Sequence, residues 1–227
     1  SIARDIGDEP LQYSTKFTDI IVGVAEKRSL GINSLLNRTS PEVDLILMDD
    51  AFQHRFVKPG LSILLTDYKH LFTRDFLLPA GRLRESRSGK RRADIIIVTK
   101  APKDILHEER KKIENEINPM PRQKLYFSHI VFGNPASLNP DIDKNVELGS
   151  GLSVLLLSGI ANPDSLLDYV KNKSKEVIHL RYSDHHPYSK NDIAKIKKTF
   201  EGIANQNKII LTTEKDTMRL RDTDIKD

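Results

Sequence analysis

The sequence predicts an α/β fold built around a mostly parallel sheet with helices on both faces. Three observations indicate this fold: the apolar runs are short, they are unbroken rather than alternating, and polar stretches of helical character separate them. A strand that is buried on both faces gives an unbroken apolar run, and such burial is typical of a parallel sheet covered by helices. Six runs fit this description, at residues 18–24, 43–49, 61–67, 93–100, 152–159 and 207–213.

Two charged stretches are expected to form surface helices. Residues 102–117 have a proline near the first helical position, and residues 162–173 open with Asn, Pro and Asp. Residues 133–151 are rich in Pro, Gly, Asn and Asp, which predicts a linker. We therefore expect two domains, a core lobe at residues 1–145 and a smaller C-terminal α/β lobe at residues 146–227.

Composition limits the classes of protein that this chain can belong to. The 227 residues are 38% hydrophobic, which is enough for a packed core, and the absence of cysteine excludes disulfides and thiolate metal sites. Lys and Arg exceed Asp and Glu by 36 to 32, a mild excess that favours anionic partners. The apolar runs are shorter than the roughly 20 residues that a membrane-spanning helix needs, so we expect a soluble or peripheral protein. The start, SIARDIGDEP, lacks an initiator Met, and we expect a fragment of a longer protein.

The stretch LILMDDAFQHR, residues 45–55, places two carboxylates at the end of a predicted strand. In open parallel sheets the ligand crevice lies at the carboxyl ends of the strands, and the neighbouring carboxylates of Asp49 and Asp50 suit a hard cation such as Mg²⁺ beside a nucleotide phosphate. The structural alternative is that Asp49 caps the following turn and Asp50 is solvated. Gln53 and His54 follow closely enough to return to the same crevice, although a lone histidine is as often a structural donor.

Three other stretches gather charged side chains, and each also has a purely structural interpretation. The structural alternative is a helix cap for GDEP, a surface ion pair for LLPAGRLRE and a capped turn for SDHHPYS. A basic stretch, residues 82–92, adds six cationic residues around one Glu and suits phosphates or acidic lipid, or else a solvated face. The candidates are Asp8 and Glu9 in GDEP (7–10), Arg84 and Glu85 in LLPAGRLRE (77–85), and Asp184, His185 and His186 in SDHHPYS (183–189).

The order of the motifs carries a family resemblance. GDEP, DDAFQHR, LLPAGRLRE, RRAD with its following strand, SGIANP, SDHHPYS and TTEKD occur in this order over nearly the whole chain. They resemble the motif series of the tetraacyldisaccharide 4′-kinase family, which phosphorylates the 4′-hydroxyl of the lipid A precursor disaccharide with ATP and Mg²⁺. The resemblance implies a P-loop-NTPase-like fold and peripheral contact with the cytoplasmic face of the Gram-negative inner membrane. No nucleic acid partner is expected.

The resemblance also implies residue roles. Asp8 is expected to be a catalytic residue partnered by His185, and Asp50 a third catalytic residue. A hydroxyl that attacks a phosphoryl group needs a positioned base, a metal on the phosphates and cationic donors, so these roles are chemically consistent. The expected metal ligands are Asp49, Asp50 and Glu85, and the expected substrate or phosphate contacts are Glu9, Gln53, His54, Arg84 and Asp184.

The sequence departs from the family pattern in several places. It contains no Gly-rich segment ending in Gly-Lys-Thr, the loop that cradles the nucleotide phosphates in this family, so we expect these 227 residues to be inactive by themselves. Position 51 is Ala where the family usually has Gly, and position 82 is Arg where it usually has Pro. Two alternatives remain: a metal-dependent phosphoesterase, for which DHH and DD are typical ligand sets, and a non-catalytic binding module with the kinase fold.

Overall fold

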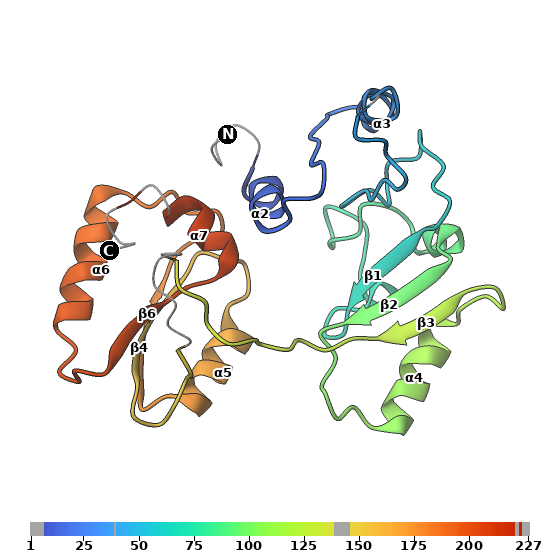
Figure 1. Ribbon diagram of the computed structural model, residues 1–227. Helices are drawn as coiled ribbons and strands as arrows, with labels where there is room; N and C mark the ends of the chain where they lie inside the picture. The colour runs from blue at the N-terminus through green and yellow to red at the C-terminus, as the bar shows by residue number, and fades with distance from the viewer. Residues whose placement is uncertain (1–6, 39, 139–145, 221–222, 224–227) are drawn as a thin grey trace. The chain divides into compact units, whose positions relative to one another are not determined.

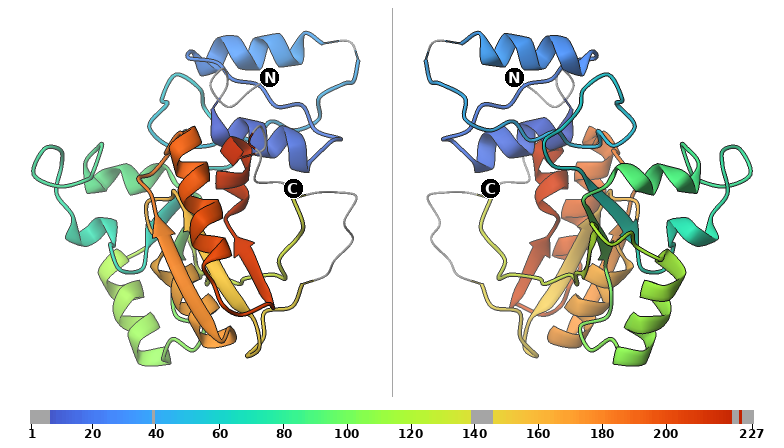
Figure 2. Two further views of the ribbon diagram at one scale, coloured as in Figure 1. Left: turned by 90° about the vertical axis from the view of Figure 1, so that its left-hand side faces the viewer. Right: turned by 90° about the vertical axis from the view of Figure 1, so that its right-hand side faces the viewer.

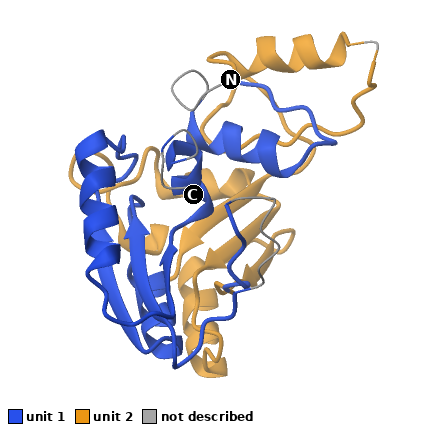
Figure 3. Cartoon of the chain, turned by 60° about the vertical axis from the view of Figure 1, so that its left-hand side comes forward, with its two compact units in different colours: residues 1–24, 132–227 blue, residues 25–131 orange. Residues whose placement is uncertain are grey.

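The chain divides into two compact units. The computed structural model describes residues 7–38, 40–138, 146–220 and 223 (Figure 1). Unit 1 consists of residues 1–24 and 132–227, and unit 2 consists of residues 25–131 (Figure 3).

These units differ from the expected division into residues 1–145 and 146–227. The first helix of the described residues, α2 (Asp8–Lys16), contacts the last described helix, α7 (Glu214–Leu220), and therefore groups with the C-terminal residues. Lys16 forms an ion pair of 2.8 Å with Glu214 across this contact. The expected boundary at residue 145 itself lies outside the described residues.

Unit 1 contains a three-stranded parallel sheet in the order β5-β4-β6 (Figure 2). The strands are β4 (Ser153–Ser158), β5 (Glu176–Arg181) and β6 (Lys208–Leu211). All six residues of the central strand β4 are buried. The unbroken apolar run that predicted β4 thus reflects burial on both faces, as expected.

Helices cover both faces of this sheet. Because side chains alternate along a strand, Leu155 and Leu157 of β4 pack on one face with Ile196 of α6 (Lys190–Glu201) and Leu220 of α7. On the other face, Val154 and Leu156 pack with Val170 of α5 (Asp164–Lys173). The predicted α/β architecture is confirmed, and the loops at Gly159 and Tyr182 follow the carboxyl ends of β4 and β5.

Helix α6 begins with a capping box. The Ser189 side chain accepts a hydrogen bond from the Asp192 backbone N–H at 3.2 Å, and the Asp192 carboxylate accepts from the Ser189 backbone N–H at 2.8 Å. The hydrogen bonds from the Ser189 side chain and backbone, together with His186, lower the pKa of Asp192 to about 2. The N-terminus of α6 is therefore capped by the side chains of Ser189 and Asp192.

Unit 2 contains a second three-stranded parallel sheet, in the order β1-β2-β3. The strands are β1 (Ile63–Asp67), β2 (Ile95–Thr99) and β3 (Lys124–Phe127). The core of the unit lies on one face of the sheet, where Ile96 and Val98 of β2 belong to one buried cluster with residues of α4 (His107–Ile117). On the opposite face Ile63 is 45% exposed and Leu65 is 62% exposed. The described residues therefore leave this face partly uncovered, whereas we expected helices on both faces.

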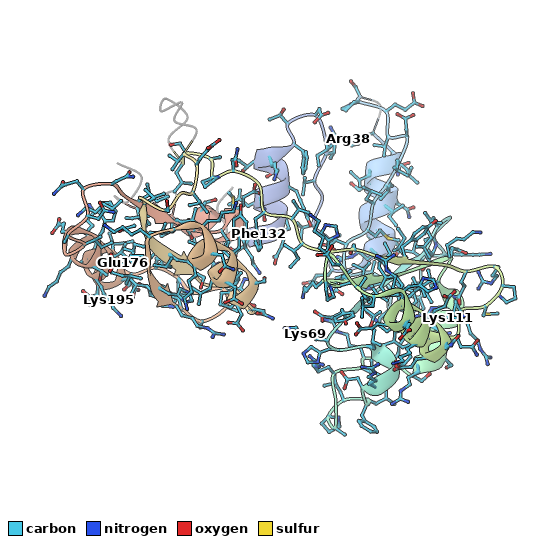
Figure 4. The ribbon with its side chains drawn as sticks, turned by 90° about the horizontal axis from the view of Figure 1, so that it is seen from below. Arg38, Lys69, Lys111, Phe132, Glu176 and Lys195 are labelled. Atoms are coloured by element: carbon cyan, nitrogen blue, oxygen red, sulfur yellow. The ribbon has the colours of Figure 1, made fainter. Side chains whose placement is uncertain are left out.

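The outer surfaces of the covering helices are charged. Lys111 on α4 and Lys195 on α6 are exposed, and each is labelled in Figure 4. Apolar residues of the same helices, such as Ile113 and Ile196, are buried. This division of polar and apolar faces is the amphipathic pattern of helices that pack on a sheet.

Two predicted strands are absent, since residues 18–24 and 43–49 form none. Leu45 and Leu47 are exposed instead. An apolar run becomes a strand only where another strand satisfies its backbone groups, and the described residues offer these two runs no such partner. The remaining elements of the described chain are α3 (Arg28–Leu36) and two 3₁₀ helices, η1 (Phe72–Arg74) and η2 (Arg87–Arg92).

Candidate active site

The candidate residues fall into two groups, one in each unit. In unit 1 the chain brings together four predicted residues around the start of α2 and the turn after β5. The other six predicted residues lie in unit 2, in the loop that follows residue 48 and in the segment that precedes η2. The unit 1 group is Asp8, Glu9, Asp184 and His185, and the unit 2 group is Asp49, Asp50, Gln53, His54, Arg84 and Glu85.

Asp8 and His185 form a direct contact. Asp8 is the first residue of α2 and its side chain is only 8% exposed. His185 Nδ1 donates a hydrogen bond of 2.8 Å to Asp8 Oδ2. His185 has a φ of 56°, in the left-handed region that non-glycine residues rarely adopt, and such strain concentrates at functional sites. The pair predicted from the motifs GDEP and SDHHPYS is thus assembled within one unit.

Arg219 of α7 is a second partner of Asp8, and sequence reasoning missed it. Its side chain is 8% exposed, and its Nε lies 3.3 Å from Asp8 Oδ2 as a charge contact without hydrogen-bond geometry. Its Nη1 donates to the His186 carbonyl at 3.0 Å and its Nη2 to the Gly159 carbonyl at 3.2 Å. The guanidinium therefore ties α7 to the two loops that border Asp8.

Asp216 neutralises Arg219 inside the unit. The Asp216 side chain is fully buried and accepts a hydrogen bond of 2.8 Å from Arg219 Nη2. It also accepts from Thr213 Oγ1 at 2.7 Å and from the Tyr188 hydroxyl at 3.2 Å. Burial, followed by the Asp216 charge, raises the pKa of Tyr188 well above its usual range. A buried carboxylate with this many donors is a satisfied structural centre.

Gly159, in the motif SGIANP, permits this arrangement. Its backbone N–H donates to Asp216 Oδ2 at 3.0 Å. A Cβ at this position would lie 2.7 Å from Asp216 Oδ1, closer than a real Cβ contact. The carboxyl end of β4 is therefore anchored to α7 through a residue that has to be glycine.

Lys215 gathers the remaining acidic residues of the unit 1 group. Its Nζ lies 2.8 Å from Glu9 Oε1, 3.7 Å from Asp184 Oδ1 and 3.3 Å from His185 Nε2. The hydrogen bond from Lys215 is the main cause that lowers the pKa of Glu9. Burial alone would lower the pKa of Lys215, but Glu9, Asp184 and Asp8 together raise it. The predicted residues Glu9 and Asp184 thus share one cation beside the Asp8–His185 pair.

In unit 2, Asp49 and Asp50 lie in an exposed turn. Asp49 Oδ1 accepts from the Asp50 backbone N–H at 2.9 Å, and Asp50 has a left-handed φ of 45°. Asp50 Oδ2 forms an ion pair of 2.9 Å with Arg84 Nη1, in which the two side chains are 70% and 60% exposed, respectively. The predicted residues Asp50 and Arg84 are therefore brought together, but in contact with solvent.

Glu85 points to a different partner. Its carboxylate pairs with Arg92 Nη2 at 2.6 Å, and the same nitrogen donates to the Phe52 carbonyl at 3.0 Å. Arg92 also stacks over the Phe52 ring at 4.7 Å. One shallow hollow is lined by Gln53, Arg84 and Glu85. His54 lies in a tight turn, in which its backbone N–H donates a hydrogen bond to the Ala51 carbonyl.

The acidic residues of unit 2 fit Mg²⁺ only in part. Asp49 and Asp50 offer the oxygen ligands that Mg²⁺ uses, and Mg²⁺ commonly takes one or two carboxylates with water and substrate phosphates. In the described part of the chain no three His, Cys, Asp or Glu side chains are grouped so that they could hold a metal. Glu85 as a metal ligand stays a prediction, since its carboxylate pairs with Arg92. The cluster that a two-metal phosphoesterase requires is not found among these residues.

The supporting residues of this site follow one strand end. Lys215 belongs to the TTEKD motif, whose Thr and Lys suit a ligand contact or a helix cap, whereas roles for Asp216 and Arg219 were missed. Lys215, Asp216 and Arg219 occur in TTEKDTMR, directly after β6, with Thr213 just ahead of them. Acidic and basic residues at a spacing of three or four on a short helix share one face. This spacing, placed at the carboxyl end of a predicted strand, is the signal that could have identified them.

Comparison with known proteins gives one consistent family. The profile of the family described as tetraacyldisaccharide-1-P 4′-kinase matches residues 1–227. A tetraacyldisaccharide 4′-kinase of Bacteroides thetaiotaomicron is 48% identical over 97% of this chain and 60% of its own length. The proteins of the same name from Bacteroides fragilis and Flavobacterium johnsoniae are 47% and 42% identical, over 97% and 98% of this chain and 60% and 63% of their own lengths. No solved structure matches the chain.

Proposed function

Because the chain belongs to the tetraacyldisaccharide-1-P 4′-kinase family, we propose that the full-length protein transfers the γ-phosphoryl group of ATP to the 4′-hydroxyl of a tetraacyldisaccharide 1-phosphate, a step of lipid A biosynthesis. The chain spans about 60% of the length of the curated relatives named above, so the proposal concerns the whole protein. The observation that carries it is the hydrogen bond between His185 and the buried Asp8, in a chain of this family.

Asp8 is the proposed general base. As the 4′-oxygen bonds to the γ-phosphorus, the bond from that phosphorus to the bridging oxygen of ADP breaks, and the hydroxyl proton passes to the Asp8 carboxylate. His185 orients Asp8 through its Nδ1–H at 2.8 Å. Arg219, 3.3 Å from the same oxygen and held in place by Asp216, fixes the position of Asp8 from the other side.

The unit 2 residues are proposed to bind the nucleotide phosphates. Asp49 and Asp50 would hold Mg²⁺, which when bound neutralises negative charge on the phosphates. The Arg84 guanidinium offers a planar fork that suits a phosphate as well as the Asp50 carboxylate with which it pairs now. Gln53 and His54, from the same turn, are proposed as additional donors, and Glu85 as a second carboxylate near the metal.

We also propose peripheral contact with the cytoplasmic face of the bacterial inner membrane. A substrate with four acyl chains resides in a bilayer, and a basic surface is attracted to anionic lipid. The basic stretch at residues 82–92 lies in unit 2, where Arg87 and Arg91 are exposed. Within the described residues, no helix combines the length and the apolar character needed to cross a membrane.

The test is product formation by the full-length gene product, because these 227 residues contain no Gly-rich loop ending in Gly-Lys-Thr. The protein is incubated with γ-labelled ATP, Mg²⁺ and tetraacyldisaccharide 1-phosphate in detergent micelles, and the lipid is analysed by mass spectrometry. We expect one added phosphate at the 4′ position and no transfer to an analogue that lacks the 4′-hydroxyl. Hydrolysis of a phosphoester with Mn²⁺ and without ATP would instead support the phosphoesterase alternative and overturn the proposal.

A further inference from the structure

The ammonium group of Lys215 lies within hydrogen-bond distance of two acceptors and within ion-pair distance of a third. Glu9 Oε1 lies at 2.8 Å, His185 Nε2 at 3.3 Å and Asp184 Oδ1 at 3.7 Å. A lysine ammonium is a donor only, so the ring nitrogen that faces it has to present a lone pair. A hydrogen bond across this contact therefore requires a His185 Nε2 that carries no proton.

The other ring nitrogen of His185 faces an acceptor. Nδ1 lies 2.8 Å from Asp8 Oδ2, and a carboxylate accepts hydrogen bonds. A neutral imidazole with its single proton on Nδ1 satisfies both contacts at once. In the doubly protonated imidazolium, the Nε2 proton would point at the Lys215 cation.

We propose that Lys215 is a positioning residue that keeps His185 neutral, with its proton on Nδ1, so that Asp8 remains a carboxylate without an imidazolium counter-ion. This role deepens the proposed kinase function and rests on it for its kinetic consequence. A carboxylate that pairs with an imidazolium is a weaker base toward a sugar hydroxyl than one that accepts from a neutral imidazole. Lys215 thereby acts on the base through His185 and contacts no reacting atom in this assignment.

The charges around His185 show why a cation is needed there. Carboxylates face the ring region from α2, where Asp8 and Glu9 lie, and from Asp184 in its own turn, where Asp184 Oδ2 is 3.7 Å from Nε2. From α7, Arg219 is neutralised by the buried Asp216, which leaves Lys215 as the cation directed at Nε2 among the described residues. Without Lys215, the three carboxylates would favour the imidazolium.

The direct test is the protonation state of His185 in the full-length protein. ¹⁵N-labelled histidine reports by NMR whether each ring nitrogen carries a proton, and His185→Gln identifies the signal. We expect Nε2 to be unprotonated near pH 7 in the wild type and protonated at the same pH in Lys215→Met. A wild-type ring that is already doubly protonated, or an unchanged ring in Lys215→Met, would overturn the proposal. Because this readout needs no activity, it stands apart from the proposed function.

Kinetics give the second readout. In Lys215→Met, kcat should fall roughly tenfold near pH 7 and recover at higher pH, where the imidazolium loses its proton. Lys215→Arg, which keeps the cation, should restore most of the rate. The matched control is Lys16→Met, which removes the other lysine ion pair between α2 and α7 and should leave the pH profile unchanged. An equal loss of kcat at every pH would indicate a structural role and contradict the proposal.

Discussion

The two groups of candidate residues differ in how far this chain organises them by itself. In unit 1 the sheet is covered on both faces, and Asp8 and Arg219 meet with side chains that are each 8% exposed. In unit 2 the core lies on one face of the sheet, and the Asp50–Arg84 pair is mostly exposed. Both groups contain a residue with left-handed φ, His185 and Asp50, respectively.

The difference indicates two levels of preorganisation. A base needs a fixed position and a controlled environment, and the buried side chains of Asp216 and Arg219, with the partly exposed Lys215, supply both to the Asp8–His185 pair. Phosphate and metal ligands can instead be drawn together by the ligand's own charge. We therefore predict that substitutions in the unit 1 network change folding stability and chemistry together, whereas substitutions in the unit 2 group change ligand binding alone.

The largest effect on stability is expected at Asp216. Asp216→Asn removes the charge that neutralises the buried Arg219, and loss of one partner of a buried ion pair costs about 3–5 kcal/mol. Asp50→Asn, which breaks an exposed ion pair, should cost less than about 1 kcal/mol. Urea denaturation followed by circular dichroism compares the two variants. Equal losses of unfolding free energy in the two variants would contradict the proposed difference in preorganisation between the two groups.

The two sheets should also respond differently to the loss of a leucine side chain. Leu155→Ala in the fully buried strand β4 should cost about 3 kcal/mol, because it leaves a cavity between covered faces. Leu65→Ala in β1 should cost much less, because that side chain is already 62% exposed. Hydrogen exchange measured by mass spectrometry shows in which unit each variant loses stability. A large loss at Leu65 would show that the exposed face is buried in the full-length protein.

A smaller, pH-dependent effect is expected at the capping box of α6. Asp192 has a pKa of about 2, below its ordinary value, so its contribution to stability is present above about pH 4 and is lost as the pH falls towards 2. Asp192→Asn should therefore cost about 1 kcal/mol at neutral pH and progressively less as the pH falls through about 2. Thermal denaturation over this pH range measures the difference. Asp104→Asn ahead of α4, an exposed position, is the control and should show no such trend.

The sequence predicted the fold class because central parallel strands are unbroken apolar runs, as β2 and β4 are. It missed β5, an edge strand whose sequence EVIHLR interrupts the apolar run with charged and polar residues. It also placed strands at residues 18–24 and 43–49, where the described structure has none. Apolar periodicity reports a residue's tendency to be buried, but pairing depends on which strands are neighbours.

The sequence predicted the motif residues of the candidate site but not the residues that hold them in position. Asp8 and His185, which are 177 residues apart, were paired by family resemblance, and their hydrogen bond is present. Roles for Asp216 and Arg219 were missed because a charged helix after a strand is usually a solvated surface. Their importance comes from tertiary burial against α2 and the loop at Gly159, which local sequence does not encode.

The most direct measurement is the turnover number of Asp8→Asn in the full-length protein with ATP and tetraacyldisaccharide 1-phosphate. The substitution keeps the shape of the side chain and removes its ability to accept the hydroxyl proton. We predict that kcat falls by at least about 100-fold, with little change in the KM for ATP, because the nucleotide is proposed to bind through other residues. A variant that retains kcat within a fewfold of the wild type would contradict the assignment of Asp8 as the base.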